Sequence, residues 1–294
     1  MADLRRIRAA ILGWYHVESR PYPWRATRDP WAVLVSEVML QQTQAARVVE
    51  RYPAFLRRYP TPAAMAAAPE REALAAWSGL GYNRRALALR RAAVAVERDG
   101  WPRDVAGLQS LPGVGPYTAR ALAGLAFGEA VGVVDTNVRR WLVRRLGLGV
   151  GATARELQAQ ADAFASPAAD ASEASDWIHA SMEFGARVCR ARDPRCNTCP
   201  VARGCPSRGR AGRVPVPRQP RFAGSAREAR GAVVRALATA GDHALPEAEL
   251  GAGLAGSDLA SVIDGLERDG LAHRDGARVR LGPAPPRPAA TIVP

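Results

Sequence analysis

The chain has 294 residues, 48% of them apolar, which is enough for one large domain and a smaller one with buried cores. The formal net charge is +13, which favours nucleic acid as a partner over the alternative of a basic surface with no single ligand. No apolar run of about 18 residues is present and no signal peptide is evident, so a cytoplasmic protein without a membrane span is expected. All 41 basic residues are arginine, and this excludes catalysis through a lysine Schiff base.

The first 205 residues are predicted to be helical, because apolar residues recur three and four positions apart between prolines and glycines. No alternating β pattern is found there, so residues 1–205 are expected to form an all-α domain of about ten helices. The clearest helical patterns are Leu4–Val17, Trp31–Val49, Glu70–Leu80, Arg84–Val96, Tyr117–Phe127, Asn137–Leu146 and Asp176–Val188.

The remaining residues change character along the chain. Residues 206–224 are rich in Pro, Gly and Arg and are expected to form an extended linker. In residues 225–282, three helical patterns precede a hairpin pattern that turns at Asp275-Gly276, which predicts a small winged-helix-like α+β module. These patterns are Ala226–Ala240, Pro246–Leu254, Asp258–Gly270 and Leu271–Leu281. Residues 283–294 are rich in Pro and Ala and are expected to be a disordered tail.

The four cysteines are spaced C-x6-C-x2-C-x5-C within residues 189–205. In a cytosolic protein such a group indicates a metal site rather than disulfides. Only one CxxC pair is present and no His lies among them, which favours a 4Fe-4S cluster, with zinc as the alternative. We expect a structural cluster that folds the loop. Its ligands are predicted to be Cys189, Cys196, Cys199 and Cys205.

Residues 111–119 read L-P-G-V-G-P-Y-T-A and lie between two helical patterns. Gly113 and Gly115 lack a Cβ, so another molecule can approach their backbone closely. Pro116 suits the first turn of a helix, where free N–H groups can bind a phosphate oxygen. The pattern is typical of a helix-hairpin-helix DNA-binding element, although an ordinary joint between two helices is the alternative.

These motifs together resemble the helix-hairpin-helix DNA glycosylase superfamily over about residues 5–206. Within it, the Ser36–Gln44 sequence S-E-V-M-L-Q-Q-T-Q is similar to the MutY-type adenine-specific branch, as are Pro23-Trp24-Arg25 and Gly79–Tyr82. The resemblance implies an all-α helix-hairpin-helix glycosylase fold with an iron–sulfur cluster loop. It also implies a monomeric, bacterial, nucleoid-associated enzyme of base-excision repair.

The implied reaction is hydrolysis of the N-glycosidic bond of adenine mispaired with 8-oxoguanine or guanine in double-stranded DNA, without strand cleavage. By resemblance, Glu37 protonates the base, and Asp135 stabilises the sugar cation or bonds to it transiently. Asn137 and Tyr117 support this chemistry, and Gln42 and Tyr82 enter the duplex beside the lesion pair. Further DNA-binding residues implied in this way are Gly113, Gly115, Arg25 and Thr118. The implied base pocket is formed by Arg20, Trp24 and His179.

The two carboxylates lie in contrasting sequence settings, which suits a pair with different tasks. Glu37 lies inside an apolar helical pattern, where burial favours the protonated form. Asp135 ends an apolar run where a helix begins, and a helix N-terminus favours the anion. The alternatives are a solvent-facing helix glutamate and a plain N-cap aspartate.

Several positions depart from the family pattern, and other functions stay open. Thr136 replaces the Gly of a D-G-N motif, Asn83 replaces a second Tyr, and His179 replaces a Gln or Glu that is expected to touch adenine. The C-terminal module is too short and too helical for the Nudix-like domain that reads 8-oxoguanine in many relatives. An endonuclease III-like enzyme would need a lysine at Tyr117. A thymine or uracil mismatch glycosylase and a non-catalytic DNA-binding regulator are the remaining alternatives.

Overall fold

The computed structural model describes residues 2–149, 151–209, 221–251 and 258–285. The chain divides into two compact units, one made of residues 1–38 and 101–218 and the other of residues 39–100 and 219–294. The boundaries of these units differ from those of the predicted segments 1–205, 206–224 and 225–282, because the second unit combines residues 39–100 with the C-terminal residues. The predicted domain boundaries stay predictions. Most of the predicted tail, and the central part of the linker, lie outside the described residues. Among the described helices, none has the length and apolar character needed to cross a membrane.

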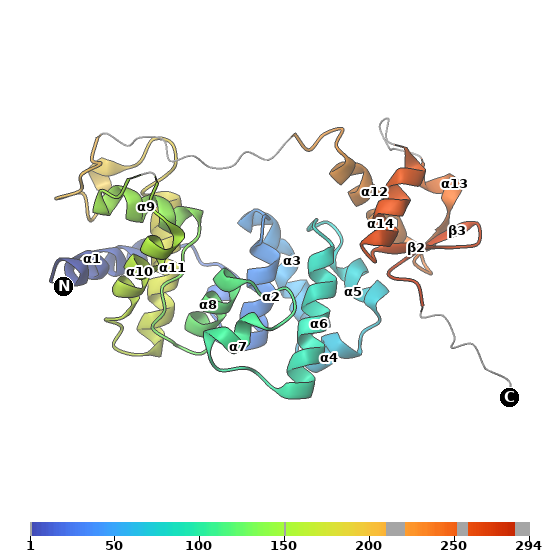
Figure 1. Cartoon of the computed structure of the whole chain (residues 1–294), viewed down its shortest axis with the longest axis horizontal. Helices are drawn as coiled ribbons and strands as arrows, with labels where there is room; N and C mark the ends of the chain where they lie inside the picture. Colours follow the sequence, from blue (N-terminus) through green and yellow to red (C-terminus); the bar gives the residue numbers. More distant parts are fainter. Residues whose placement is uncertain (1, 150, 210–220, 252–257, 286–294) are drawn as a thin grey trace. The chain divides into compact units, whose positions relative to one another are not determined.

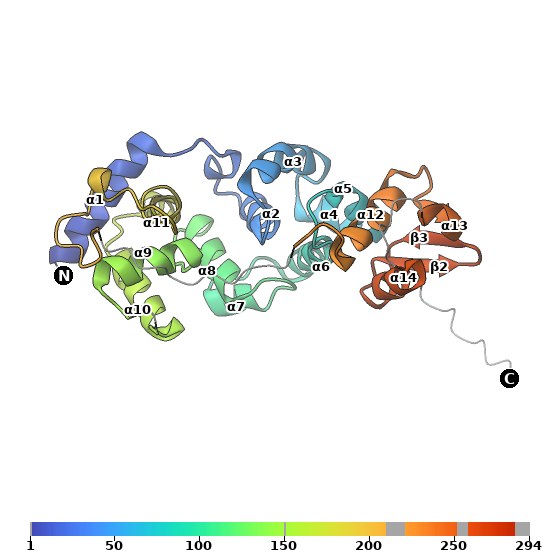
Figure 2. The same cartoon turned by 90° about the horizontal axis from the view of Figure 1, so that it is seen from above.

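The first unit is helical and is organised around the buried indole of Trp141. The ring centroids of Phe164 and Phe184 lie 5.3 Å and 5.9 Å from that of Trp141. Helices α1, α9, α10 and α11 supply this core and lie together in Figure 2. The elements are α1 (Ala2–Glu18), η1 (Pro23–Arg25), the start of α2 (Pro30–Leu40), α7 (Val105–Gln109), α8 (Pro116–Leu125), α9 (Thr136–Leu146), α10 (Ala154–Ala165), α11 (Ala171–Arg187) and η2 (Cys196–Thr198).

The second unit joins a helical segment from the first third of the chain to the C-terminal module. Its core includes Phe55 and Trp77, whose ring centroids are 5.7 Å apart. Helix α12 of the C-terminal module packs against α5 (Figure 1). The elements are α3 (Ala45–Arg58), α4 (Pro62–Ala67), α5 (Glu70–Trp77), α6 (Arg84–Asp99), α12 (Ala226–Thr239), β1 (Ala244–Pro246), α13 (Glu247–Leu250), α14 (Leu259–Arg268), β2 (Ala272–Asp275) and β3 (Arg278–Leu281).

The C-terminal module has the winged-helix order of elements, which confirms the predicted fold class. Strands β1, β3 and β2 form an antiparallel sheet in that order, and β2 and β3 turn through Gly276 with φ 59°. Strand β1 was not predicted from the sequence. The helix expected at Pro246–Leu254 is the shorter α13, and residues 252–257 lie outside the described part.

The long helix expected at Trp31–Val49 is two helices, because α2 ends at Leu40 and α3 begins at Ala45. Between them Gln42 adopts a left-handed backbone with φ 55°, which no α-helix accommodates. Apolar periodicity alone does not reveal this break, because the pattern continues in phase on both sides of it. The helices α4 and α10 were also missed, and the helix expected before the L-P-G-V-G hairpin is the short α7.

Candidate active site and cluster loop

Glu37 lies on α2 and is buried, with 5% of its surface exposed. Its apolar neighbours were expected from the sequence, and its predicted burial is confirmed. Burial and the negative charge of Asp135 raise the pKa of Glu37 from 4.5 to about 7. The Tyr117 hydroxyl on α8 is within hydrogen-bonding reach of the Glu37 side chain and lies 3.2 Å from Met182 Sδ, and its single hydrogen can serve one of them at a time. A carboxyl of this kind is protonated in a large fraction of molecules near neutral pH, so it can act as an acid.

Asp135 is the N-cap residue of α9, as expected. Its Oδ1 accepts hydrogen bonds from the backbone N–H groups of Asn137 at 2.8 Å and Val138 at 2.6 Å. Its Oδ2 accepts a bond from Asn137 Nδ2 at 2.7 Å. Burial nevertheless raises the pKa of Asp135, while these donors and the charge of Arg140 lower it. The expectation that the helix N-terminus would give Asp135 an opposite shift to Glu37 is therefore wrong, because burial outweighs the capping bonds.

A chain of hydrogen bonds connects Asp135 to the cysteine loop. Arg140 Nη2 donates to Asn137 Oδ1 at 2.8 Å and to the carbonyl of Gly185 at 2.5 Å, and Arg140 Nε donates to the Cys189 carbonyl at 2.7 Å. Gly185 of α11 lies so close to α9 that a Cβ there would be 2.5 Å from the Asn137 carbonyl oxygen. The loop that carries the cysteines is thus packed against the helix that carries the aspartate.

Glu183 on α11 is a buried carboxylate that sequence reasoning did not assign to the site. Arg20 makes two bonds to it, at 2.7 Å and 2.8 Å, and Arg25 Nη2 makes one at 2.9 Å. The pKa of Glu183 is lowered by these two arginines against the effect of burial. The only signal in the sequence was its position four residues after His179, on the same helix face.

His179 is buried one turn before Glu183 on α11. Burial and the charge of Arg25 lower its pKa to about 3, so the imidazole is neutral at physiological pH. Trp24 is buried and stacks on Tyr22, with ring centroids 4.7 Å apart. The base pocket is expected to be formed by Arg20, Trp24 and His179. All three belong to the same unit as Glu37 and Asp135.

Two residues expected to contact DNA are held inside the first unit. The Arg25 side chain is 12% exposed and lies over the rings of Tyr15 and Tyr22, in addition to its ion pair with Glu183. The Thr118 side chain is buried at 3% exposure. Neither residue therefore presents an open side chain to a phosphate, and Arg25 is better placed to shape the base pocket.

The helix-hairpin-helix pattern folds as expected, with α7 and α8 joined by residues 110–115. Gly113 has φ 80°, in the region that glycine adopts readily, and Pro116 begins α8. Gly113 and Gly115 are exposed, and a Cβ on Gly115 would meet no atom of the chain within 4 Å. The chain itself does not require glycine at position 115, so this open side is available to another molecule.

Gln42 and Tyr82 lie in the second unit, on two exposed loops. Both residues have left-handed backbones, with φ 55° at Gln42 and 46° at Tyr82, and Tyr82 is 41% exposed. Side chains other than glycine enter this region at a cost of about 1–2 kcal/mol, so tertiary contacts must hold them there. Exposed side chains in an enforced conformation suit residues that enter a DNA duplex.

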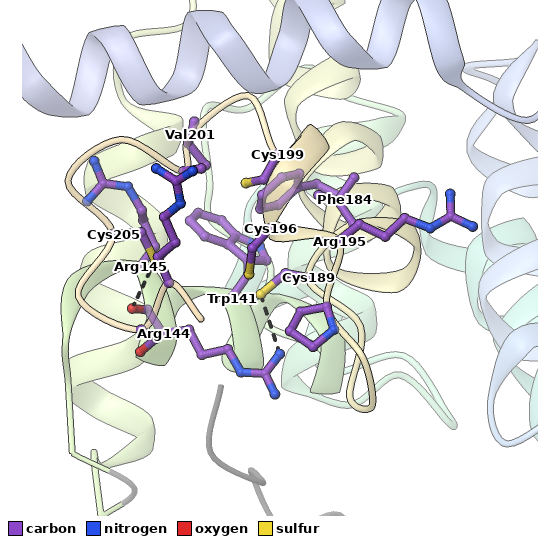
Figure 3. A pocket seen from close by; sticks show the side chains of 15 residues that line it. Trp141, Arg144, Arg145, Phe184, Cys189, Arg195, Cys196, Cys199, Val201 and Cys205 are labelled. Atoms are coloured by element: carbon purple, nitrogen blue, oxygen red, sulfur yellow. Dashed lines mark hydrogen bonds between the residues drawn. The ribbon is translucent and has the colours of Figure 1, made fainter. Parts of the chain in front are cut away.

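The four cysteines line a single pocket together with Trp141 and Phe184 (Figure 3). All are half-buried and none forms a disulfide. In the described residues no three His, Cys, Asp or Glu side chains come together around one point that could hold a metal ion.

The side chains around this pocket suit a negatively charged group. Arg144 and Arg145 line the pocket and are buried at 4% and 8% exposure. Arg144 Nη1 lies 3.7 Å from Cys189 Sγ and donates to the Arg190 carbonyl at 2.6 Å. Burial raises the pKa of the Cys199 thiol to about 11, so a bound metal would be needed to keep it as a thiolate.

The fold and these motifs are similar to those of known proteins. A family model for HhH-GPD superfamily base excision DNA repair proteins matches residues 35–167. The chain is 41% identical over 271 residues to an adenine DNA glycosylase of Mycobacterium tuberculosis, covering 88% of this chain and 84% of the relative.

Two solved structures are also similar. A thermostable thymine-DNA glycosylase superposes with a TM-score of 0.65 and 29% identity, covering 71% of this chain and 97% of that protein. A trapped covalent intermediate of endonuclease III with DNA superposes with a TM-score of 0.58 and 25% identity, covering 70% of this chain and 97% of that protein.

Proposed function

Because this chain belongs to the adenine DNA glycosylase family, whose members are base-excision repair enzymes that hydrolyse N-glycosyl bonds, we propose that it removes adenine mispaired with 8-oxoguanine or guanine from double-stranded DNA. One observation carries the proposal. A buried carboxyl, Glu37, with a pKa of about 7 is electrostatically coupled to the capped carboxylate of Asp135. A neutral acid beside an anion is the pair that glycosidic bond cleavage requires.

The reaction divides between these two residues. Glu37 gives a proton to a ring nitrogen of the extruded adenine, and the bond between the base and the sugar carbon breaks with its electron pair going to the base. Asp135, held by Asn137 and Val138, offsets the positive charge that develops on the sugar. Water then adds to the sugar carbon, and the Glu37 carboxylate takes up the released proton, which restores the acid.

The supporting residues have defined tasks in this proposal. Tyr117 orients the Glu37 carboxyl through its hydroxyl group. The neutral His179 and the Glu183 pair with Arg20 and Arg25 shape the pocket for the base. Gln42 and Tyr82 fill the gap that the extruded adenine leaves, since a base inside the duplex cannot be reached. The exposed backbone at Gly113 and Gly115 binds a phosphate.

We further propose that Cys189, Cys196, Cys199 and Cys205 hold a 4Fe-4S cluster, which fits the shared pocket and the arginines around it. When bound, the cluster would cross-link the loop and offer no chemistry to base release. The chain's own residues link it to the site, because Arg140 contacts both the Cys189 carbonyl and Asn137. We also propose that the chain is divided into a glycosylase domain, a linker and a winged-helix-like domain. We propose that it acts as a monomer.

A thymine or uracil mismatch glycosylase is the second candidate, because a thymine-DNA glycosylase is among the similar structures. A buried acid at position 37 favours adenine, since a purine leaving group benefits from direct protonation. The two candidates separate in one experiment with the full chain. Duplexes with adenine opposite 8-oxoguanine, thymine opposite guanine, or thymine glycol are incubated with it and then treated with or without hot alkali.

Cleavage of only the adenine duplex, and only after alkali, is the expected result. Cleavage of the thymine duplex would support the second candidate, and cleavage without alkali would indicate strand incision. Binding of all three duplexes without base release would instead identify a DNA-binding regulator.

A further inference from the structure

The loops that carry Gln42 and Tyr82 meet at one side chain, Arg85, in the first turn of α6. Both loops contain a left-handed residue, so neither conformation is maintained by local preference. One direct hydrogen bond between the loops is long, because Thr43 Oγ1 lies 3.4 Å from the Leu80 carbonyl. The relative placement of the two exposed side chains therefore depends on what joins the loops.

The guanidinium of Arg85 bonds to the backbone on both sides. Nη1 donates to the carbonyls of Met39 at 3.0 Å and Gln41 at 2.5 Å, which lead into the first loop. Nη2 donates to Thr43 Oγ1 at 3.0 Å, on the other side of Gln42. The acceptors on both sides of Gln42 are thus bound by the same guanidinium group.

The second loop is bracketed in the same way. Nη2 of Arg85 also lies 3.2 Å from the Leu80 carbonyl and 2.9 Å from the Gly81 carbonyl, immediately before Tyr82. Nε lies 3.3 Å from the carbonyl of Tyr82 itself. The guanidinium lies 5.3 Å from the ring centroid of Trp77 and 5.5 Å from that of Tyr82.

Only arginine offers this arrangement. Its planar fork of N–H donors can serve acceptors in several directions, whereas a lysine ammonium is a point charge with three donors. Burial lowers the pKa of Arg85 to about 10, so it is still charged at physiological pH and its bonds to the carbonyls are charge-assisted.

We propose that Arg85 is a positioning residue that clamps the two loops together, so that Gln42 and Tyr82 enter the duplex as one rigid wedge. The proposal rests on the proposed function, because it requires that these two residues fill the gap left by an extruded base. Without the clamp each loop relaxes separately, and the wedge no longer resists the stacked bases that close the gap.

The test measures base extrusion directly, with the full chain carrying Glu37→Gln so that no base is released. The probe is a duplex with 2-aminopurine opposite 8-oxoguanine, whose fluorescence rises when the base leaves the stack. Arg85→Lys is expected to reduce this fluorescence gain by about fivefold, the equivalent of about one net hydrogen bond. Thr43→Val removes a single acceptor and is expected to reduce the fluorescence gain less. It provides the test if the Arg85→Lys chain does not fold.

Arg90→Lys is the matched control. Arg90 also lies on α6 and also binds backbone carbonyls, those of Ala68 at 2.6 Å and Ala66 at 3.0 Å, but it contacts neither loop. It is expected to leave the fluorescence gain unchanged. Adding Arg85→Lys to a Tyr82→Ala chain is expected to cause little further loss, because the two changes act through the same wedge.

An equal fluorescence gain in the Arg85→Lys and Arg90→Lys chains would overturn the proposal, as would additive losses with Tyr82→Ala. No gain in the chain with Arg85 intact would overturn both the wedge and the clamp. If the chain with Glu37 intact releases no adenine but the differences in fluorescence hold, the proposed function fails and the clamp stands.

Discussion

Glu37 on α2 and Asp135 at the start of α9 are electrostatically coupled, and the charge of Asp135 adds to burial in raising the pKa of Glu37 to about 7. The two residues are nearly a hundred positions apart in the chain. Burial, and after it the negative charges of Glu37 and Asp135, raise the pKa of the Tyr117 hydroxyl well above its usual value. The proposed chemistry depends on this coupling.

Replacing Glu37 by Gln is expected to abolish adenine release and to leave DNA binding nearly unchanged. The amide keeps the shape of the side chain but cannot donate the proton, and one missing acid typically costs about 10²–10⁴-fold in rate. Single-turnover rates and gel-shift affinity on the adenine:8-oxoguanine duplex measure the two effects. Glu97→Gln, at an exposed position of α6, is the control. Turnover near the level of the control would remove Glu37 from the mechanism.

The rate of base release is expected to fall as the pH rises above about 7. The active form of Glu37 is protonated, and with a pKa of about 7 it loses its proton in that range. The single-turnover rate constant at saturating enzyme should then fall by about tenfold per pH unit at alkaline pH. A rate that stays level between about pH 6 and pH 9 would contradict the assignment of Glu37 as the acid.

The Glu37→Gln chain is expected to be more stable than the original chain at alkaline pH. The pKa of Glu37 is about 7 in the folded state and near 4.5 when unfolded, so ionisation favours unfolding. The stability linked to Glu37 is complete below about pH 4.5 and is lost as the pH rises through 7. Urea unfolding should show that the free energy of unfolding of the Glu37→Gln chain exceeds that of the original chain by about 3 kcal/mol at pH 8. At pH 4 the two free energies should be nearly equal. Equal differences at both pH values would mean that the carboxyl is not buried.

Gly185→Ala is expected to impair both stability and base release. The added Cβ would lie 2.5 Å from the Asn137 carbonyl oxygen and 2.7 Å from its carbon, so the first turn of α9 must move. Overpacking of this kind costs about 1–3 kcal/mol, and it displaces the donors that hold Asp135. Gly13→Ala in α1 is the control, because its Cβ meets no atom within 4 Å and it should stabilise the helix. Thermal unfolding and single-turnover rates of both variants test this, and similar results for the two would contradict it.

The protein purified with its native iron is expected to carry about four iron atoms per chain, with acid-labile sulfide and absorbance at about 400 nm. Cys199→Ser should lower the iron content and the thermal stability together, because the cluster cross-links the loop. Ser207→Ala, in the same pocket lining but not a metal ligand, should retain both. Full metal loading with zinc, without sulfide or this absorbance, would exclude the cluster.

Some features of this protein follow from short stretches of sequence. The two helices around the L-P-G-V-G hairpin, the N-cap at Asp135 and the turn at Asp275-Gly276 each depend on residues within about one turn of one another. The burial of Glu37 was also predictable, because apolar residues occupy the neighbouring positions of its helix. For such features the chain needs no distant partner, so residue type and spacing are sufficient.

Only the tertiary structure decided the rest. The break between α2 and α3 lies at Gln42, whose left-handed backbone is flanked by bonds from Arg85 of α6 to Gln41 and Thr43. Glu183 becomes a site residue because Arg20 and Arg25 reach it from about 160 positions away. The pKa of Asp135 moved against the local expectation, because burial by distant segments outweighed its capping bonds. Burial and charge are sums over the whole fold, and no short pattern in the sequence contains that sum.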